Sequence, residues 1–284
     1  MPDISPALYR AGEGEPLVLL HGFTATWRCW LPNIAELVPR FEVIAPTLHG
    51  HDGGPVLPDG QKAKGIGEAA DHVEQQLDEL GIGDAHFAGN SMGGALALEI
   101  AKRGRARSVV AISPGGGWRE DDREEAERII RWFSRNQKLA RASLPRAEKI
   151  MRRPGARRLA LRDVMTRGDQ VPAKEAVALV RSSVACTVVD DVFATIRSGS
   201  GLMRDLDRIS CPVLVAWGDK DRILPLAKHG PRFRDEVPGV DFRVWKGVGH
   251  TPMWDDPSLI AGTIADFAGA AGARAGATTA VSAA

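Results

Sequence analysis

Short, mostly apolar runs alternate with segments of helical periodicity along much of this chain, and this alternation constrains the fold more than any other feature. Runs of this kind lie at residues 16–20, 42–46, 85–89, 108–114, 211–218 and 241–247. A short continuous apolar run is typical of a strand that is buried on both faces of a sheet. Strands that alternate with helices usually pair in parallel. The sequence therefore predicts an α/β fold, with a mostly parallel, doubly wound sheet and helices on both faces.

The middle of the chain breaks this alternation. Residues 118–208 contain only helical segments, which are interrupted at Pro145, Pro154 and Gly168. We therefore expect an all-helical lid, or cap, inserted after the sixth strand. A segment of this kind would sit on the α/β core and be free to cover a site there.

The expected lid divides the chain into four parts. They are a first core part at 1–117, the lid at 118–208, a second core part at 209–268 and a tail at 269–284. The tail consists mostly of Ala, Gly, Ser and Thr and lacks an apolar face, so we expect it to be flexible. The last helix is then expected to end near Ala268.

Composition excludes several classes of function. The net charge of +1 gives no indication of a nucleic-acid partner. The three cysteines, Cys29, Cys186 and Cys211, match no zinc-binding spacing, so no metal site is expected. No signal peptide and no apolar run of about 18 residues is visible, so we expect a cytoplasmic protein without stable membrane insertion. The oligomeric state is left open.

Ser91 lies in "GNSMG", residues 89–93, between a predicted strand and a predicted helix. This is the G-x-S-x-G pattern of a sharp strand-to-helix turn, in which glycines avoid clashes and the serine takes a strained conformation. The following helix directs its first N–H groups to the same place. The same residues would also suit a plain helix cap. The strand before and the helix after the motif favour a nucleophile.

A serine nucleophile requires a base, and the base requires an acid that orients it. His250 follows the run at 241–247, and Asp219 and Asp221 follow the run at 211–218. Both positions correspond to carboxyl ends of strands, where an open α/β sheet places its site. His250 is thus the expected base rather than a surface histidine. Spacing alone leaves Asp219 and Asp221 open as the acid.

The oxyanion of an acyl-transfer reaction requires two N–H donors. The first is expected from Met92, the residue after the nucleophile, and the second from Phe23 in the loop "LLHGFTA". His21 and Gly22 form a tight turn after the first apolar run. We expect the side chain of His21 to serve as a structural hydrogen-bonding group rather than as a second base.

Together these motifs resemble those of the α/β-hydrolase family. The resemblance is carried by "HGF" at 21–23, "GNSMGG" at 89–94, "GDKDRILP" at 218–225 and "GHTPMWDDP" at 249–257, in the family's order. It spans residues 17–267 apart from the predicted lid, which lies where the family carries its own. The resemblance implies that Asp221 is the acid. One loop departs from the family pattern, because it reads "TLHGHDGG" at 47–54 where D-x-P-G-H-G-x-S is common.

The resemblance also narrows the reaction. A serine at this turn argues against the haloalkane dehalogenase and epoxide hydrolase branches, which form an alkyl ester on an aspartate. "GNSMGGA" is similar to the turn of the C–C bond hydrolases, but those commonly carry a Trp after the catalytic His, where this chain has Thr251. We therefore expect a serine hydrolase that cleaves a carboxylic ester of a small, largely apolar molecule through Ser91, His250 and Asp221. The alternatives are a C–C bond hydrolase, a thioesterase or lactonase, and a non-hydrolytic lyase, synthase or ligand receptor.

No metal or organic cofactor is implied by these motifs. Seven residues near the motifs or in the lid are predicted to bind the substrate: His21, Gly22, Thr24, Asn90, Trp132, Val192 and Thr251. A second feature of the lid is its charge. Between residues 134 and 162 it has ten Lys and Arg and one acid, Glu148. This stretch is either a solvated helix face or a surface for an anionic substrate, carrier protein or membrane.

Overall fold

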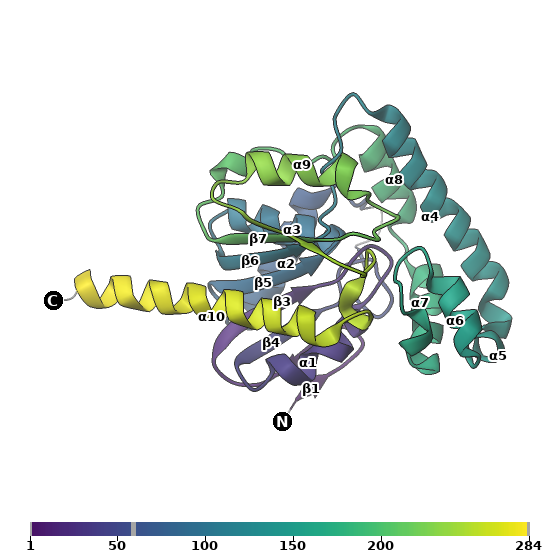
Figure 1. Ribbon diagram of the computed structural model, residues 1–284, viewed down its shortest axis with the longest axis horizontal. Helices are drawn as coiled ribbons and strands as arrows, with labels where there is room; N and C mark the ends of the chain where they lie inside the picture. Colours follow the sequence, from purple (N-terminus) through teal and green to yellow (C-terminus); the bar gives the residue numbers. More distant parts are fainter. Residues whose placement is uncertain (1, 58–60, 283–284) are drawn as a thin grey trace.

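The computed structural model describes residues 2–57 and 61–282, and it contains one sheet of eight strands (Figure 1). Their order across the sheet is β1-β2-β4-β3-β5-β6-β7-β8. Strands β3 to β8 pair in parallel, and β1 and β2 are added antiparallel at one edge. The strands are β1 (Asp3–Ile4), β2 (Leu8–Ala11), β3 (Glu15–Leu20), β4 (Phe41–Pro46), β5 (Ala85–Asn90), β6 (Ala106–Ile112), β7 (Val213–Gly218) and β8 (Asp241–Trp245). The predicted fold class is confirmed.

Helices cover both faces of the sheet. The core helices are α1 (Leu31–Leu37), α2 (Ile66–Glu79), α3 (Met92–Lys102), α9 (Leu226–Glu236) and α10 (Pro257–Ser282). Apolar side chains of α2, α3 and α9 form one buried cluster with one face of the strands, and those of α1 and α10 form a second cluster on the other face. Figure 1 shows α1 and α10 on the side of the sheet opposite to α3 and α9.

The chain between β6 and β7 contains only helices, as expected from the pattern at 118–208. They are α4 (Arg123–Ser143), α5 (Ala147–Met151), α6 (Pro154–Leu161), α7 (Ala173–Ala185) and α8 (Val189–Arg197), with short 3-10 turns at Leu144–Arg146, Gly168–Gln170 and Leu206–Arg208. We call residues 118–208 the helical insertion. It packs on the core beside the carboxyl ends of the parallel strands (Figure 1).

The last helix differs from its expected end near Ala268. Helix α10 continues to Ser282, so most of the segment expected as a tail is helical. Alanine has the highest intrinsic helix propensity, which allows an Ala-rich segment to extend a helix that is already nucleated by packing. Residues 283 and 284 of the expected tail lie outside the described residues. The flexibility of 269–284 stays a prediction.

Candidate active site

Ser91 occupies the sharp turn between β5 and α3. Its backbone has φ 56° and ψ −116°, a conformation that is strained for a non-glycine residue. The flanking glycines are required by contacts. A Cβ at Gly89 would lie 2.1 Å from the Gly93 carbonyl oxygen, and a Cβ at Gly93 would lie 2.2 Å from the Leu20 carbonyl oxygen. The strained turn predicted from G-x-S-x-G is therefore confirmed.

Two backbone N–H groups beside Ser91 are available to a ligand. Within the described part of the chain, neither the Phe23 N–H nor the Met92 N–H donates a hydrogen bond. Gly22 lies directly against the serine, since a Cβ at position 22 would be 3.3 Å from the Ser91 Cβ. The loop that carries Phe23 and the start of α3 thus meet at Ser91. This arrangement suits an anionic oxygen bound between the two donors.

His250 and Asp221 form a buried pair at the ends of β8 and β7. The distance from His250 Nδ1 to Asp221 Oδ2 is 2.7 Å. Because an ionised carboxylate only accepts hydrogen bonds, Nδ1–H is the donor, and Nε2 then carries the free lone pair of a neutral ring. Asp221 Oδ1 accepts from the N–H groups of Ile223 and Leu224 at 2.9 and 2.8 Å. Burial acts to raise the pKa of Asp221, but His250 and these two N–H groups outweigh it and hold the pKa below its ordinary value.

Asp219, the other candidate acid, has a different contact. Its Oδ1 accepts from the Gly247 N–H at 2.7 Å, and this hydrogen bond joins the loops that follow β7 and β8. The same hydrogen bond, with a smaller contribution from Lys220, lowers the pKa of Asp219. Asp221 and not Asp219 bonds to His250, and this contact favours Asp221 of the two candidates that spacing left open.

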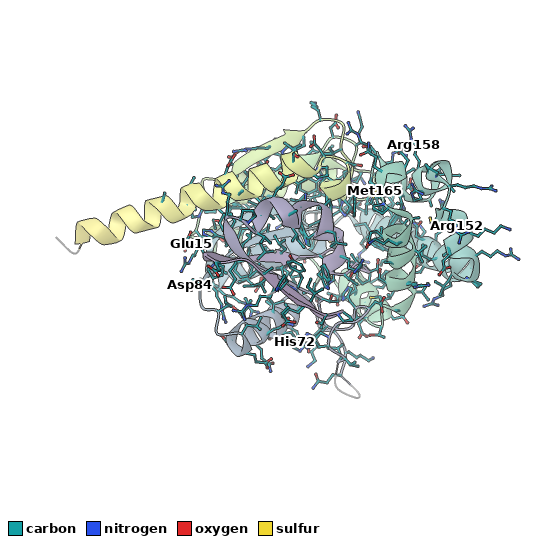
Figure 2. The ribbon with its side chains drawn as sticks, turned by 90° about the horizontal axis from the view of Figure 1, so that it is seen from below. Glu15, His72, Asp84, Arg152, Arg158 and Met165 are labelled. Carbon is teal, nitrogen blue, oxygen red and sulfur yellow. The ribbon has the colours of Figure 1, made fainter. Side chains whose placement is uncertain are left out.

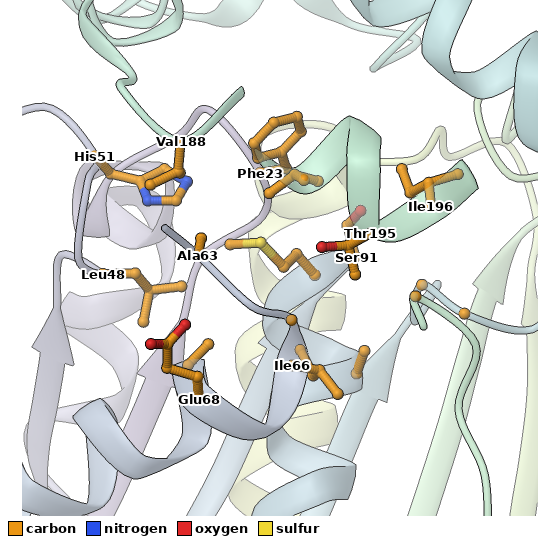
Figure 3. A pocket seen from close by; sticks show the side chains of 18 of the residues that line it. Phe23, Leu48, His51, Ala63, Ile66, Glu68, Ser91, Val188, Thr195 and Ile196 are labelled. Atoms are coloured by element: carbon orange, nitrogen blue, oxygen red, sulfur yellow. The ribbon is translucent and has the colours of Figure 1, made fainter. Parts of the chain in front are cut away.

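An apolar cavity opens onto Ser91, between the core and the helical insertion (Figure 3). It encloses about 1220 Å³, part of which is open to solvent. Its walls come from the loop at Phe23, from α2, from the start of α3 and from α4 and α8 of the helical insertion. The polar side chains in the lining include His49, Glu68, His72 and Gln76, and none of these four is fully buried. The lining is therefore mostly apolar, and it also includes Thr195 and the buried imidazole of His51.

Only one of the seven predicted substrate-binding residues lines this cavity in the described structure. That residue is Val192 of α8. His21 is fully buried, and its Nε2 accepts from the Leu48 N–H at 2.9 Å, so it holds two loops together as a structural group. Trp132 directs its ring N–H to Asp163 at 3.3 Å. Gly22, Thr24, Asn90 and Thr251 also lie outside the lining.

Asn90 has a positioning contact that the sequence did not reveal. Its side-chain amide donates to the His250 carbonyl at 2.8 Å and to the Ile112 carbonyl at 3.2 Å, and the residue is buried. It therefore links the serine turn to the histidine loop. These contacts favour a role in orienting the site, whereas substrate contact by Asn90 stays a prediction.

Asp255 is a residue of the site region that sequence reasoning missed. Its buried carboxylate accepts from the N–H groups of Gly249 at 2.8 Å, Thr166 at 2.9 Å and Arg167 at 2.7 Å. These donors come from the histidine loop and from the helical insertion. The acid pair in "GHTPMWDDP" was the available signal, but an Asp before a Pro and a helix is usually a cap.

Glu125 fixes the helical insertion to the core. This fully buried carboxylate of α4 accepts from His229 Nε2 at 2.8 Å and from Lys228 Nζ at 3.0 Å, both on α9, and from Arg128 Nε at 2.9 Å. Burial acts to raise the pKa of Glu125, but its three partners outweigh burial and hold the pKa well below the ordinary value. Arg128 also donates to the carbonyl of Ile223, the residue whose N–H group donates to Asp221. The network therefore couples the insertion to the acid loop.

Comparison with known proteins identifies the family. The alpha/beta hydrolase family matches residues 17–263, which is most of the chain. The chain belongs to the alpha/beta hydrolase family. Its mostly parallel sheet of eight strands, with helices on both faces, matches this family's fold.

Among relatives of this alpha/beta hydrolase, epoxide hydrolase EphH of Mycobacterium tuberculosis is 34% identical over 199 residues, which cover 70% of this chain and 92% of that protein. A 2-hydroxy-6-oxo-6-phenylhexa-2,4-dienoate hydrolase of Burkholderia cepacia is 26% identical over 285 residues, with 90% and 88% covered. Among solved structures, a thermophilic esterase from Thermogutta terrifontis has a TM-score of 0.69 at 22% identity, with 95% of this chain and 99% of that chain covered. The structural match shows the fold alone.

Across 2–57 and 61–282, no cluster of three or more His, Cys, Asp or Glu is arranged to hold a metal ion. Among those residues, no helix combines the length and the apolar character that crossing a bilayer requires.

Proposed function

We propose that this alpha/beta hydrolase is a serine hydrolase that cleaves a carboxylic ester of a small, largely apolar substrate. The observation that carries the proposal is the position of Ser91, in a strained turn that faces an apolar cavity between two free N–H donors. The hydrogen bond between Asp221 and His250 supports it, because it leaves His250 Nε2 as a base. The apolar lining supports an apolar substrate.

The proposed reaction has two stages. Ser91 Oγ attacks the ester carbonyl carbon while His250 Nε2 accepts the hydroxyl proton, and the N–H groups of Phe23 and Met92 stabilise the oxyanion. His250 then protonates the departing alcohol, which leaves an acyl-enzyme. A water molecule gives a proton to His250 and attacks the acyl carbon, and His250 then returns that proton to Ser91 Oγ as the carboxylic acid leaves. Asp221 keeps the His250 ring in the required tautomer and stabilises its cation.

One relative is named an epoxide hydrolase, but a serine nucleophile argues against this reaction. Attack of a serine hydroxyl on an epoxide carbon would give an alkyl ether, and an ether has no carbonyl carbon that water can attack. The enzyme would then be trapped after one turnover. An ester substrate gives an acyl-enzyme that water can cleave, so the chemistry of Ser91 favours the ester.

The second candidate is a C–C bond hydrolase that acts on a diketone-type substrate. It is favoured by the relative from Burkholderia cepacia, whose match covers 90% of this chain. Such a reaction must protonate a carbon leaving group, which calls for polar groups around it. The lining of the cavity as a whole is mostly apolar, which favours the ester. Thioesters and lactones share the acyl chemistry and remain within the proposal.

We also propose that the helical insertion acts as a lid. Its support is the contribution of α4 and α8 to the cavity wall, where Phe133 and Ile196 line the same cavity as Ser91. Phe133 also packs against Phe23, with ring centroids 5.1 Å apart. Displacing the insertion would therefore expose the cavity and disturb the loop that carries one oxyanion donor.

The test is the hydrolysis of p-nitrophenyl esters of graded chain length, together with labelling by a fluorophosphonate probe. Wild type should turn over and be labelled, and Ser91→Ala should lose the label and lower kcat on the order of 10⁶-fold. Ser113→Ala is the matched control, because Ser113 is also buried with a positive φ of 44°. Ser113→Ala should keep both the ester turnover and the labelling of wild type. Equal labelling of wild type and Ser91→Ala would refute the assignment of Ser91 as the nucleophile. Turnover of a vinylogous diketone but of no ester would favour the second candidate.

A further inference from the structure

The far end of the helical insertion carries a cationic surface that the proposed reaction does not use. We define the cationic surface by six exposed side chains, which lie on the second half of α4, the following turn, α5 and α6. They are Lys138, Arg141, Arg146, Lys149, Arg152 and Arg158. Figure 2 shows Arg152 and Arg158 extending outward from the insertion, at the end of the molecule opposite to the C-terminus of α10.

The charge of this surface is not compensated within the described part of the protein. None of its six cations forms a salt bridge there, whereas Arg103 on the core pairs with both Asp71 and Glu74. The acid nearest in sequence, Glu148, is itself exposed and pairs with Arg181 of α7. Six cations on consecutive elements, none of them paired with an acid, repel one another, and a negatively charged partner would relieve that repulsion.

Two exposed leucines accompany the cations. Leu139 of α4 is 56% exposed and Leu159 of α6 is 63% exposed. Each lies next to a cation in the sequence, at Lys138 and Arg158. Moving a large, exposed apolar side chain out of water lowers the free energy of the system. A nearby cation keeps such a side chain close to a negatively charged surface. The pattern is that of a surface which adsorbs to lipid headgroups.

We propose that the cationic surface docks this hydrolase peripherally on bilayers that contain anionic phospholipids. An acidic protein or a nucleic acid would satisfy the charges but would leave the leucines without a role. The bilayer accounts for both, because cations contact the headgroups while leucines reach the apolar boundary. Docking of this kind inserts no helix, and it does not depend on the reaction at Ser91.

The expected strength follows from the number of cations. Each Lys or Arg close to an anionic leaflet raises the partition coefficient between vesicles and water about fivefold. Neutralising two of the six should therefore lower partition roughly 25-fold. The interaction should also weaken as salt rises, because the Debye length falls from about 10 Å at 0.1 M to about 3 Å at 1 M.

The test is co-sedimentation of the Ser91→Ala protein with vesicles of phosphatidylcholine and phosphatidylglycerol in a 7:3 ratio, compared with pure phosphatidylcholine. We expect binding to the anionic vesicles only, and about 25-fold weaker partition for Arg152→Gln/Arg158→Gln. The control is Arg123→Gln/Arg208→Gln, since both arginines are exposed and form no salt bridge with another described residue. The control should match its parent within twofold. Equal losses in the two double variants, or equal binding to both vesicle types, would overturn the proposal.

A second variant separates lipid from other anionic partners. Leu139→Ser/Leu159→Ser keeps every charge, so it should weaken vesicle binding while leaving any binding to heparin or duplex DNA unchanged. Vesicle binding that is unaffected by loss of both leucines refutes insertion at the apolar boundary. Binding to duplex DNA without binding to anionic vesicles assigns the surface to another class of partner and also refutes the proposal. Equal thermal unfolding of all variants confirms that each is folded.

Discussion

The clearest quantitative prediction concerns Asp255→Asn. In the fold, the Asp255 carboxylate accepts from the N–H groups of Gly249, Thr166 and Arg167. An asparagine can place its single oxygen toward Thr166 and Arg167, and its NH₂ group then faces the Gly249 N–H. A buried donor without an acceptor costs about 1–3 kcal/mol, and the two remaining hydrogen bonds each lose about 1 kcal/mol when the acceptor is no longer charged. The variant should lose about 3–5 kcal/mol of unfolding free energy.

The same change should affect catalysis through His250. Gly249 directly precedes His250, so loss of its anchor allows the imidazole to move. A displacement of about 1 Å at a reacting group can cost on the order of 100-fold in rate. We expect kcat on a p-nitrophenyl ester to fall on that order, with a much smaller change in KM. Urea unfolding at pH 7 and steady-state kinetics measure the two effects.

Asp256→Asn is the matched control for this prediction. Asp256 caps α10 by accepting from the Leu259 N–H at 3.1 Å, and asparagine caps a helix about as well as aspartate. Its unfolding free energy should stay within about 1 kcal/mol of wild type. If Asp255→Asn is as stable and as active as Asp256→Asn, the anchoring role assigned to Asp255 is wrong.

Two further predictions concern the charged residues of the site and of the insertion. Asp221→Asn should lower kcat about 10⁴-fold, because the His250 tautomer is lost, while far-UV circular dichroism stays unchanged; a loss below tenfold would remove Asp221 from the proposed mechanism. Since the folded-state pKa of Glu125 lies below its unfolded value, its stabilisation is present above about pH 4.3 and is lost as pH falls further. Glu125→Gln should therefore be less stable than wild type at pH 7 but lose less stability between about pH 5 and 3, as measured by urea midpoints. Glu124→Gln changes an exposed neighbour, so its urea midpoint should fall with pH as steeply as that of wild type. The same pH dependence in wild type, Glu125→Gln and Glu124→Gln would contradict the argument.

The fold was largely predictable because its parallel strands are buried on both faces. Such strands need continuous apolar runs, which are visible without a structure. Strands β1 and β2 escaped detection because they are short and none of their residues is fully buried. The continuation of α10 beyond Ala268 was missed for another reason. Its Ala-rich sequence has no apolar face, so periodicity gives no signal for the continuation of the helix.

The candidate site also has a part that the sequence predicts and a part that it does not. The strained turn at Ser91 and the loop positions of Asp221 and His250 after two strands were predictable from short motifs, although spacing alone left Asp219 and Asp221 open. The cavity wall was not, because it forms where helices of the insertion meet the core, and that packing depends on contacts between residues distant in sequence. Residues such as His21 and Thr251 were chosen for their closeness to motifs. Closeness along the chain does not determine which side chains face the cavity.

The order of the strands also has a consequence for how the protein is made. Ser91 lies at the end of β5, whereas His250 follows β8, 159 residues later in the chain (250 minus 91). At about 5–20 residues per second, a ribosome needs roughly 8–32 seconds to synthesise that stretch. Throughout this interval the growing chain carries the serine turn without its base. The nascent protein is therefore unable to carry out the proposed reaction until its last strand has been synthesised and paired.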